Sequence, residues 1–223
     1  MHLRCLGSAA ALAWVLAASS PANALSLLDA VGGSSLASGG LLFSDFQVMF
    51  AGNDLSLDLE DYAVSPIADG FSLTGPLVVT SGESGTLMLR YRVEPIDPSA
   101  AVSGAQLSFD GQVLGTDAAS LATNGFEDFA NASLGSLFVY AIDGLGTVDS
   151  ASLPFAPTQP GLLVTLLVHL DTDELGALLA LTGPVDQRFT IVPEAPALAL
   201  CCLGVIGLVL MGRRRKETPR LEA

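Results

Sequence analysis

The fold of this chain is decided by the stretch Ser84-Gly85-Thr86-Leu87-Met88-Leu89-Arg90-Tyr91-Arg92-Val93. From its centre onward, one set of alternate residues is apolar: Leu87, Leu89, Tyr91 and Val93. In an extended strand successive side chains point to opposite faces, so this period of two places the four on one face. The intervening arginines face the other way. The stretch therefore predicts a β-strand with one face in a core and the other in water.

The same alternation recurs on both sides of this stretch. Between Asp45 and Phe50 the residues expected to face the core are Phe46, Val48 and Phe50, with Gln47 outward. Between Gly104 and Asp110 they are Ala105, Leu107 and Phe109. The run Leu162 to Leu170 is apolar on both faces apart from Thr165 and His169. Such a run is typical of a strand in the middle of a sheet.

Turn signals separate these strands. Asp110-Gly111 and Asp143-Gly144 follow strand-like runs and are predicted to form tight hairpins, where Gly supplies the required backbone angles. Asp69-Gly70 and Asn124-Gly125 are expected to punctuate the chain in the same way. Residues Asp173 to Leu181 fit either a short helix or a further strand. Short strands with frequent turns predict an all-β protein, an antiparallel β-sandwich.

The first 24 residues have the features of a secretory signal peptide. Arg4 provides a positive start, and the apolar stretch after it is too short to span a bilayer. Ala22 and Ala24 are the small residues that a signal peptidase site requires. We therefore expect residues 1–24 to be removed by signal peptidase and residues 25–191 to form one exported domain.

The C-terminal end predicts a single transmembrane helix. Residues 195–212 carry no charge, and at 1.5 Å per residue they reach about 27 Å, close to the hydrocarbon thickness of a bilayer. A basic stop follows immediately: Arg213, Arg214, Arg215 and Lys216. Because such cations stay on the cytoplasmic side, we expect the domain on the periplasmic side of the inner membrane and residues 217–223 as a cytoplasmic tail.

The segment 192–216, which begins Val192-Pro193-Glu194, resembles the sorting signal of the PEP-CTERM proteins. It has their order of a short polar motif, an apolar span and a basic stop. The usual second proline is replaced by Ala195. The resemblance implies that exosortase recognises Val192, Pro193 and Glu194, and that the product reaches the cell surface or extracellular matrix. The stretch from Leu42 to Phe46 and the one from Asp69 to Leu77 are similar to the exported parts of that family, which implies a surface or matrix sandwich.

The expected exported domain, residues 25–191, is strongly acidic. It holds twenty acidic side chains against three basic ones, a formal charge of −17, whereas the whole chain carries −14. Phosphate binding needs cations that displace counterions, so this balance excludes nucleic acid as a partner and disfavours anionic lipid. The three cysteines, Cys5, Cys201 and Cys202, fall outside the domain. A disulfide framework, a thiolate zinc site and a cysteine nucleophile are therefore excluded from it.

Two acidic clusters are the candidates for a metal site. Calcium takes several oxygen ligands from flexible loops, which acidic loops can supply. The carboxylates in question are Asp54, Asp58, Glu60, Asp171 and Asp173. Neither cluster has the spacing of a known calcium loop, so solvated turn residues are the default interpretation and no cofactor is expected.

No catalytic motif is found in the expected domain. A glycosidase needs two carboxylates roughly 5 to 9 Å apart, and twenty acidic residues guarantee accidental pairs. A hydrolytic triad would need His169, which lies inside a predicted central strand without a nucleophile elbow, so a buried or half-buried structural histidine is favoured. Aromatic platforms for sugar rings are sparse in residues 25–191, which contain Tyr62, Tyr91 and Tyr140 but no tryptophan.

We therefore interpret the chain as an exported, non-catalytic surface or matrix protein whose partners are exosortase, signal peptidase and an exopolysaccharide. Two alternatives remain open at this point: a calcium-stabilised adhesin or glycan-binding module, and a polysaccharide-active enzyme.

Overall fold

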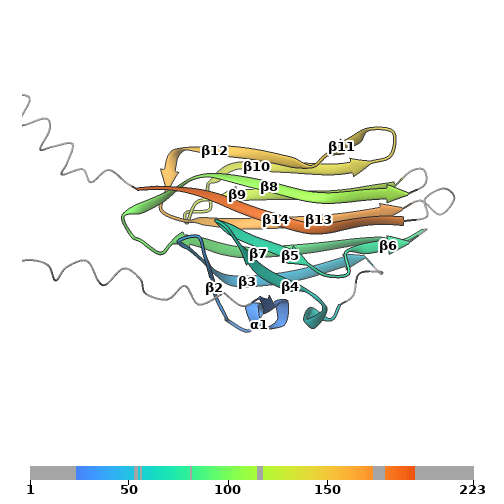
Figure 1. The fold of residues 1–223 in the computed structure, drawn as a ribbon, viewed down its shortest axis with the longest axis horizontal. Coiled ribbons are helices and arrows are strands. Elements are labelled where there is room, and N and C mark those ends of the chain that lie inside the picture. The colour runs from blue at the N-terminus through green and yellow to red at the C-terminus, as the bar shows by residue number, and fades with distance from the viewer. Residues whose placement is uncertain are drawn as a thin grey trace, which may run out of the picture.

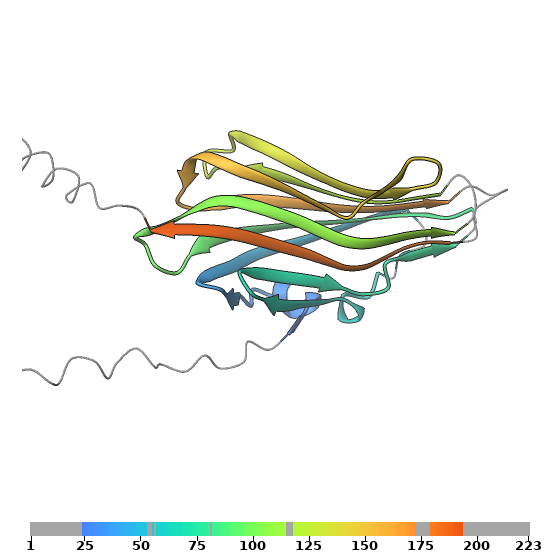
Figure 2. The ribbon, with the colours of Figure 1, turned by 45° about the horizontal axis from the view of Figure 1, so that its top comes forward.

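The computed structural model describes residues 24–52, 55, 57–80, 82–114, 118–172 and 179–193. In these residues the chain folds into two antiparallel seven-stranded sheets that pack face to face (Figures 1 and 2). The predicted all-β sandwich is thus confirmed. Within the described ranges no helix is long and apolar enough to cross a membrane. The predicted transmembrane segment and all but the last residue of the predicted signal peptide lie outside these ranges.

The first sheet, called sheet A, has the order β1-β4-β5-β14-β8-β12, with β6 also paired to β14. Its strands are β1 (Leu25–Ser26), β4 (Ala63–Ile67), β5 (Gly70–Thr74), β6 (Val78–Thr80), β8 (Ala100–Leu114), β12 (Ser150–Gln159) and β14 (Leu179–Pro193).

The second sheet, called sheet B, has the order β11-β10-β9-β13-β7-β3-β2. Its strands are β2 (Leu36–Ser38), β3 (Leu41–Gly52), β7 (Ser84–Pro95), β9 (Ala118–Glu127), β10 (Ser133–Ile142), β11 (Gly146–Val148) and β13 (Leu162–Thr172). The helix α1 (Leu27–Val31) and the 3₁₀ helix η1 (Leu59–Asp61) lie in the connections at one side of the sandwich.

The core lies between the two sheets and contains the residues that alternation predicts. Leu87, Leu89, Tyr91 and Val93 of β7 are fully buried, as are the inward residues of β13. Around Tyr91 an aromatic cluster joins the sheets, with ring centroids 5.1 Å from Phe71 and 5.7 Å from Phe46. Burial of this apolar area, at roughly 25 cal/mol per Å², is the main source of stability for such a sandwich.

A β-bulge adjusts the phase of β3. Asp45 has a φ of 57°, and the register with β7 shifts between Ser44 and Gln47. The extra residue places both Phe43 and Phe46 in the core, although three positions separate them. From Phe46 onward the predicted pattern holds, with Gln47 exposed.

Of the four predicted Asp-Gly and Asn-Gly turns, two are turns in the structure and two lie inside strands. Asp143-Gly144 forms the predicted hairpin between β10 and β11, and Asp69 lies in the hairpin between β4 and β5. The predicted turn at Asp110-Gly111 is wrong, because both residues lie inside β8. A Cβ at Gly111 would lie 2.3 Å from the Phe109 ring, so this glycine makes room for core packing rather than for a turn.

Asn124-Gly125 is also not a turn, since both residues lie inside β9. The Asn124 side chain is buried between the sheets and donates from Nδ2 to Oε1 of Gln187 on β14. Tyr91 Oη donates to the same oxygen at 3.1 Å. A hydrogen bond between the sheets, which no local pattern reveals, explains the asparagine here.

The last strand settles two boundaries. Of the ambiguous segment Asp173 to Leu181, residues 179–181 are strand and residues 173–178 lie outside the described ranges. Strand β14 continues through Val192 and Pro193, which pair with Ala101 and Ala100 of β8. The sandwich therefore extends two residues beyond the boundary expected at Ile191.

Candidate functional site

The outer face of sheet B is apolar although its side chains stay partly exposed to solvent. Strand β13 is central, as predicted, with β9 on one side and β7 on the other. Its inward residues are fully buried, but Leu163, Leu167 and His169 point outward and stay partly exposed. At the Leu163 end of the strand α1 lies nearby, since Ala30 and Val31 line a cavity together with Leu163. An apolar run that would suit burial on both sides is thus open to solvent on one.

Antiparallel register aligns the outward side chains of sheet B into rows that cross the strands. The first row, defined by direct pairing from β10 to β3, is Phe138, Thr123, Leu167, Met88 and Met49. The next row, one pleat further along, is Tyr140, Leu121, His169 and Thr86. We call these nine residues the platform. Neither row contains an acidic or basic residue other than His169.

Aromatic side chains lie at the β10 end of the platform. Phe138 and Tyr140 stand two residues apart on one strand, with ring centroids 5.3 Å apart and ring planes inclined by 36°. Phe138 is 46% exposed, and Met49 at the other end of its row is 62% exposed. These are large values for apolar side chains on a folded domain.

Hydrogen-bonding groups lie among the apolar ones. The Thr86 hydroxyl and His169 Nδ1 are 2.8 Å apart across the β7–β13 pair. This contact engages one ring nitrogen of His169, and its Nε2 has no hydrogen-bond partner in the described part of the chain. The histidine is half-buried in a central strand, as the sequence predicted. Thr123 adds a hydroxyl in the neighbouring row.

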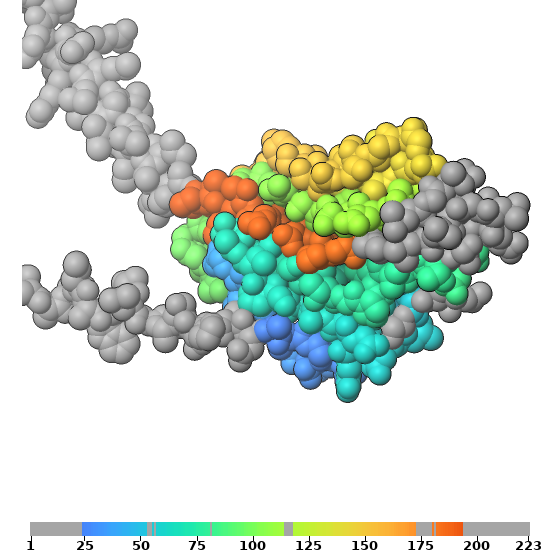
Figure 3. Space-filling model, turned by 45° about the vertical axis from the view of Figure 1, so that its right-hand side comes forward, coloured from blue at the N-terminus to red at the C-terminus, as the bar shows by residue number. Residues whose placement is uncertain are grey.

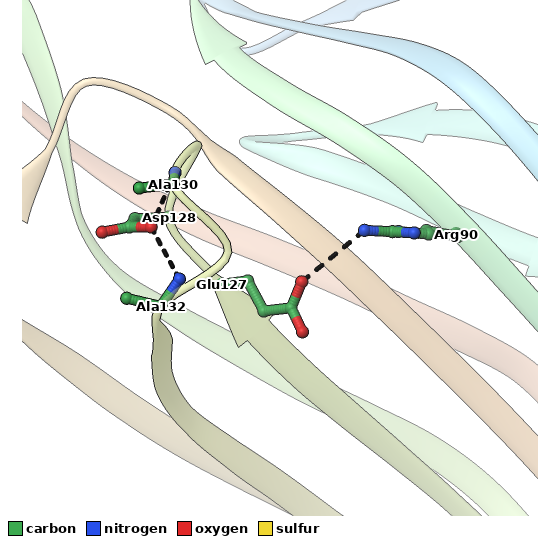
Figure 4. A network of polar contacts seen from close by, with 5 residues as sticks. All are labelled: Arg90, Glu127, Asp128, Ala130 and Ala132. Atoms are coloured by element: carbon green, nitrogen blue, oxygen red, sulfur yellow. Dashed lines mark hydrogen bonds and ion pairs between the residues drawn. The ribbon is translucent and has the colours of Figure 1, made fainter.

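Charged residues border the platform instead of entering it. Arg90 Nη2 lies 3.6 Å from Glu127 Oε2 (Figure 4), and Arg92 Nη2 donates to Glu94 Oε1 at 2.8 Å. The Arg92 guanidinium also stacks over the Phe129 ring, 4.1 Å from its centroid. Each arginine at this border thus has an acidic neighbour, and the border carries no unbalanced positive charge.

The loop after β9 keeps this border in place. Asp128 Oδ1 accepts from the backbone nitrogens of Ala130 and Ala132, both at 2.8 Å (Figure 4). Asn131 adopts a positive φ of 62° within the same loop. The turn is therefore closed by its own side chain, and Glu127 at its start is directed toward Arg90.

The structure describes three of the five calcium candidates, and it does not bring these three together. Asp58 caps η1, where its Oδ1 accepts from Glu60 N at 3.0 Å, and Glu60 is exposed in that helix. Asp171 lies in sheet B near the end of β13. Asp54 and Asp173 lie outside the described residues. Among the residues that the structure describes, no group of three metal-ligating side chains occurs.

The aromatic residues divide between core and surface. Tyr62 and Tyr91 are fully buried, so Tyr140 is the tyrosine that reaches the outside. Local sequence patterns did not single out Phe138, Met49 or Met88 as site residues. A signal was present in β10, where Phe138, Tyr140 and Ile142 alternate with the buried Leu137, Val139 and Ala141. Like β13, this strand is apolar on both faces.

The sorting residues are only partly described. Val192 and Pro193 form the end of β14, and Ala24 precedes β1. Ala22, Glu194 and the basic stop Arg213 to Lys216 lie outside the described residues.

Comparison with known proteins yields solved structures alone. No protein-family model matches the chain, and no curated protein matches it. The carbohydrate-binding module TmCBM61, solved with β-1,4-galactotriose, has 14% identity and a TM-score of 0.35, and the match covers 66% of this chain and 88% of that one. The enzymatically active domain of tailspike protein 4 from bacteriophage CBA120 has 16% identity and a TM-score of 0.32, over 66% of this chain and 20% of that one.

A third match is a structure that describes the promiscuous specificity of carbohydrate-binding modules from the β-sandwich superfamily. It has 15% identity and a TM-score of 0.27, over 67% of this chain and 57% of that one. At these identities and TM-scores the matches decide neither the ligand nor the activity of this chain.

Proposed function

We propose that this chain is an exported, non-catalytic module that binds neutral polysaccharide on the platform of sheet B. The observation that carries the proposal is the pair of cross-strand rows with Phe138 and Tyr140 at one end. A pyranose ring has an apolar C–H face and a rim of hydroxyl groups. An aromatic ring covers the first, and the Thr86, Thr123 and His169 side chains can exchange hydrogen bonds with the second.

The charge of the domain supports a neutral ligand. A formal charge of −17 repels anionic polymers at long range, and both arginines beside the platform already have acidic neighbours. A protein partner would also suit an exposed apolar face. The regular mixture of apolar and hydroxyl-bearing side chains, in two rows without Asp, Glu, Lys or Arg, favours a sugar.

The lack of carboxylates in the platform supports binding rather than hydrolysis. A glycosidase places an acid and a nucleophile or base on either side of the scissile bond, and neither platform row contains Asp or Glu. Delivery of the module is proposed from the sequence. A signal peptide directs export, the C-terminal span holds the chain in the inner membrane, and exosortase acts at Val192-Pro193-Glu194 before transfer to the cell surface or matrix.

Binding of the full chain, purified in mild detergent, to immobilised glucan, mannan and galactan, and to the anionic polygalacturonate, tests the proposal. Phe138→Ser and Tyr140→Ser are expected to weaken retention about tenfold each, which corresponds to about 1.4 kcal/mol and matches the loss of an aromatic contact. Leu145→Ser is the matched control, because Leu145 is exposed in the turn after β10 and lies outside the platform. Equal retention of all four proteins, or retention on polygalacturonate alone, would contradict the proposal.

A further inference from the structure

A second candidate site, lined by polar side chains, lies on the opposite side of the sandwich, on the outer face of sheet A. A hollow of about 710 Å³ opens there over β14, β8 and β12. Figure 3 shows this face, with β14 in orange between β5 in teal and β8 in green. Its volume falls in the range of pockets that hold small ligands. It shares no residue with the platform.

Strand register places three of the polar side chains that line the hollow in one cross-strand row. Arg188 on β14 pairs with Gln106 on β8, which pairs with Ser152 on β12. All three side chains point away from the core. Gln187, Leu107 and Ala105, which flank Arg188 and Gln106, are buried, and Ala151 and Leu153, which flank Ser152, pack against the core. Along the next row Gly104 has no side chain, so the backbone forms the floor and Pro154 borders it.

The polar groups of the hollow are largely uncommitted. Arg188 Nη2 lies 3.7 Å from Asp186 Oδ2, which is too long for a hydrogen bond, and the side chain is 43% exposed. The side chains of Gln106 and Ser152 have no hydrogen-bond partner in the described part of the chain. By contrast, Arg92 on the other sheet donates to a carboxylate at 2.8 Å.

Donors and acceptors are balanced in this hollow. Arg188 only donates hydrogen bonds, and Asp69, at the rim, only accepts them. Gln106 and Ser152 can do both. With one guanidinium and one carboxylate in the lining, a ligand of net charge gains nothing. Neighbouring sugar hydroxyls, each of which donates and accepts, can exchange hydrogen bonds with such a set of side chains.

The rim is held rigidly. The backbone N–H of Phe189 donates to the carbonyl of Asp69 at 2.8 Å, which fixes the β4–β5 turn against β14. Asp69 itself has a φ of 61°, so its carboxylate is set by the turn rather than by a flexible loop. A preorganised rim lowers the entropic cost of binding.

We infer that this hollow is a second binding site for a neutral sugar unit, and that the module bridges two polysaccharide molecules, one bound on each face. The inference rests on the proposed function for the nature of the partner. The position and chemistry of the hollow are independent of the platform.

The experiment measures bridging and binding separately with the full chain in mild detergent. Bridging is the amount of soluble fluorescent glucan, mannan or galactan that the chain captures on beads of the same polysaccharide, and binding is retention of the chain on those beads. Arg188→Ala and Gln106→Ala are expected to reduce bridging at least tenfold while retention through the platform persists. Arg188→Lys, which keeps the charge but loses the planar fork, is expected to give an intermediate result.

Gln112→Ala is the matched control, because Gln112 lies on β8 outside the hollow and is exposed. Melting temperatures of all variants show whether they are folded. Wild-type bridging by Arg188→Ala and Gln106→Ala, with both variants folded, overturns the second site and leaves the platform intact. Loss of all binding in those variants, with Phe138→Ser unaffected, supports the hollow and overturns the platform. No binding of the wild-type chain to any of the three polysaccharides overturns both.

Discussion

Tyr62 and Tyr140 carry the same phenol group in contrasting surroundings. Tyr62 is fully buried beside η1, with its ring centroid 5.6 Å from that of Phe50. Burial, and second the negative charge of Asp61, raise the pKa of Tyr62 from its ordinary value of 10.0 to about 12. Tyr140 stays partly exposed at the platform. At this scale the environment decides whether a tyrosine serves stability or the surface.

The raised pKa of Tyr62 predicts how the free energy of unfolding depends on alkaline pH. Below pH 10 Tyr62 is protonated in both the folded and unfolded chain, and its stabilising effect is complete. Between pH 10 and about 12 the unfolded tyrosine ionises while the folded one stays neutral, so the free energy of unfolding falls. Burial also raises the pKa of Tyr91, which acts in the same direction. Urea unfolding at pH 8 and pH 11 measures the effect.

Tyr62→Phe is expected to reduce the loss of stability between these two pH values, because it removes the phenol whose pKa burial raises. An identical loss in wild type and Tyr62→Phe would show that Tyr62 ionises equally in the folded and unfolded chain.

Among the elements, the pairing of β5 with β14 depends on one glycine. Gly70 pairs with Arg188, and a Cβ at position 70 would lie 1.7 Å from the carbonyl oxygen of Gln187. Backbone atoms cannot yield as a flexible side chain can. The neighbouring hydrogen bond from Phe189 N to Asp69 O holds the Asp69 rim of the hollow in place.

Gly70→Ala is therefore expected to destabilise the domain by about 3 kcal/mol, the upper range for overpacking, as measured by chemical denaturation. Gly125→Ala is the matched control. Gly125 also lies in a strand and pairs on both sides, but no atom stands within 4 Å of the position that a Cβ would take there. The methyl group is expected to be neutral or slightly stabilising at this site, because Gly weakens strand interiors. Similar losses in both variants would contradict the packing explanation.

Strands β10 and β13 show what alternation can and cannot reveal. Both are apolar on two faces, and for β13 the sequence correctly predicted a central position. A layer that covers the second face, which such a run would suit, is not found among the described residues, since Leu163, Leu167 and His169 stay partly exposed. Apolar periodicity reports that a face avoids water, and the partner that covers it can belong to another molecule.

For the whole molecule, the acidic sandwich and its C-terminal tail are predicted to act as cargo and sorting signal. Glu194→Ala is expected to block processing in a host that has exosortase, because the resemblance places recognition at Val192-Pro193-Glu194. Replacement of Arg213 through Lys216 by alanine is expected to alter membrane retention, since the cations hold the end of the span at the cytoplasmic surface.

Mass spectrometry and cell fractionation measure both effects. Glu217→Ala is the matched control, because it removes the same type of side chain from the predicted cytoplasmic tail, outside the motif and the basic stop. A Glu194→Ala protein that is processed and located like the wild type would contradict the role of the motif.

The sequence by itself determined the strand-rich character, the inward residues of β7 and of the stretch 105–109, and the central place of β13. Each follows from local alternation, which the pleat of a strand imposes on its own residues. It also determined the acidity of the domain and the absence of cysteine from residues 25–191.

The tertiary structure alone decided the two surfaces. The platform joins Met49, Met88, Thr123, Phe138 and Leu167, and the hollow joins Asp69, Gln106, Ser152 and Arg188. These residues meet because of the order and register of strands that are far apart in the chain. Pairing between distant strands depends on the packing of the whole sandwich, so no local pattern specifies which side chains share a row.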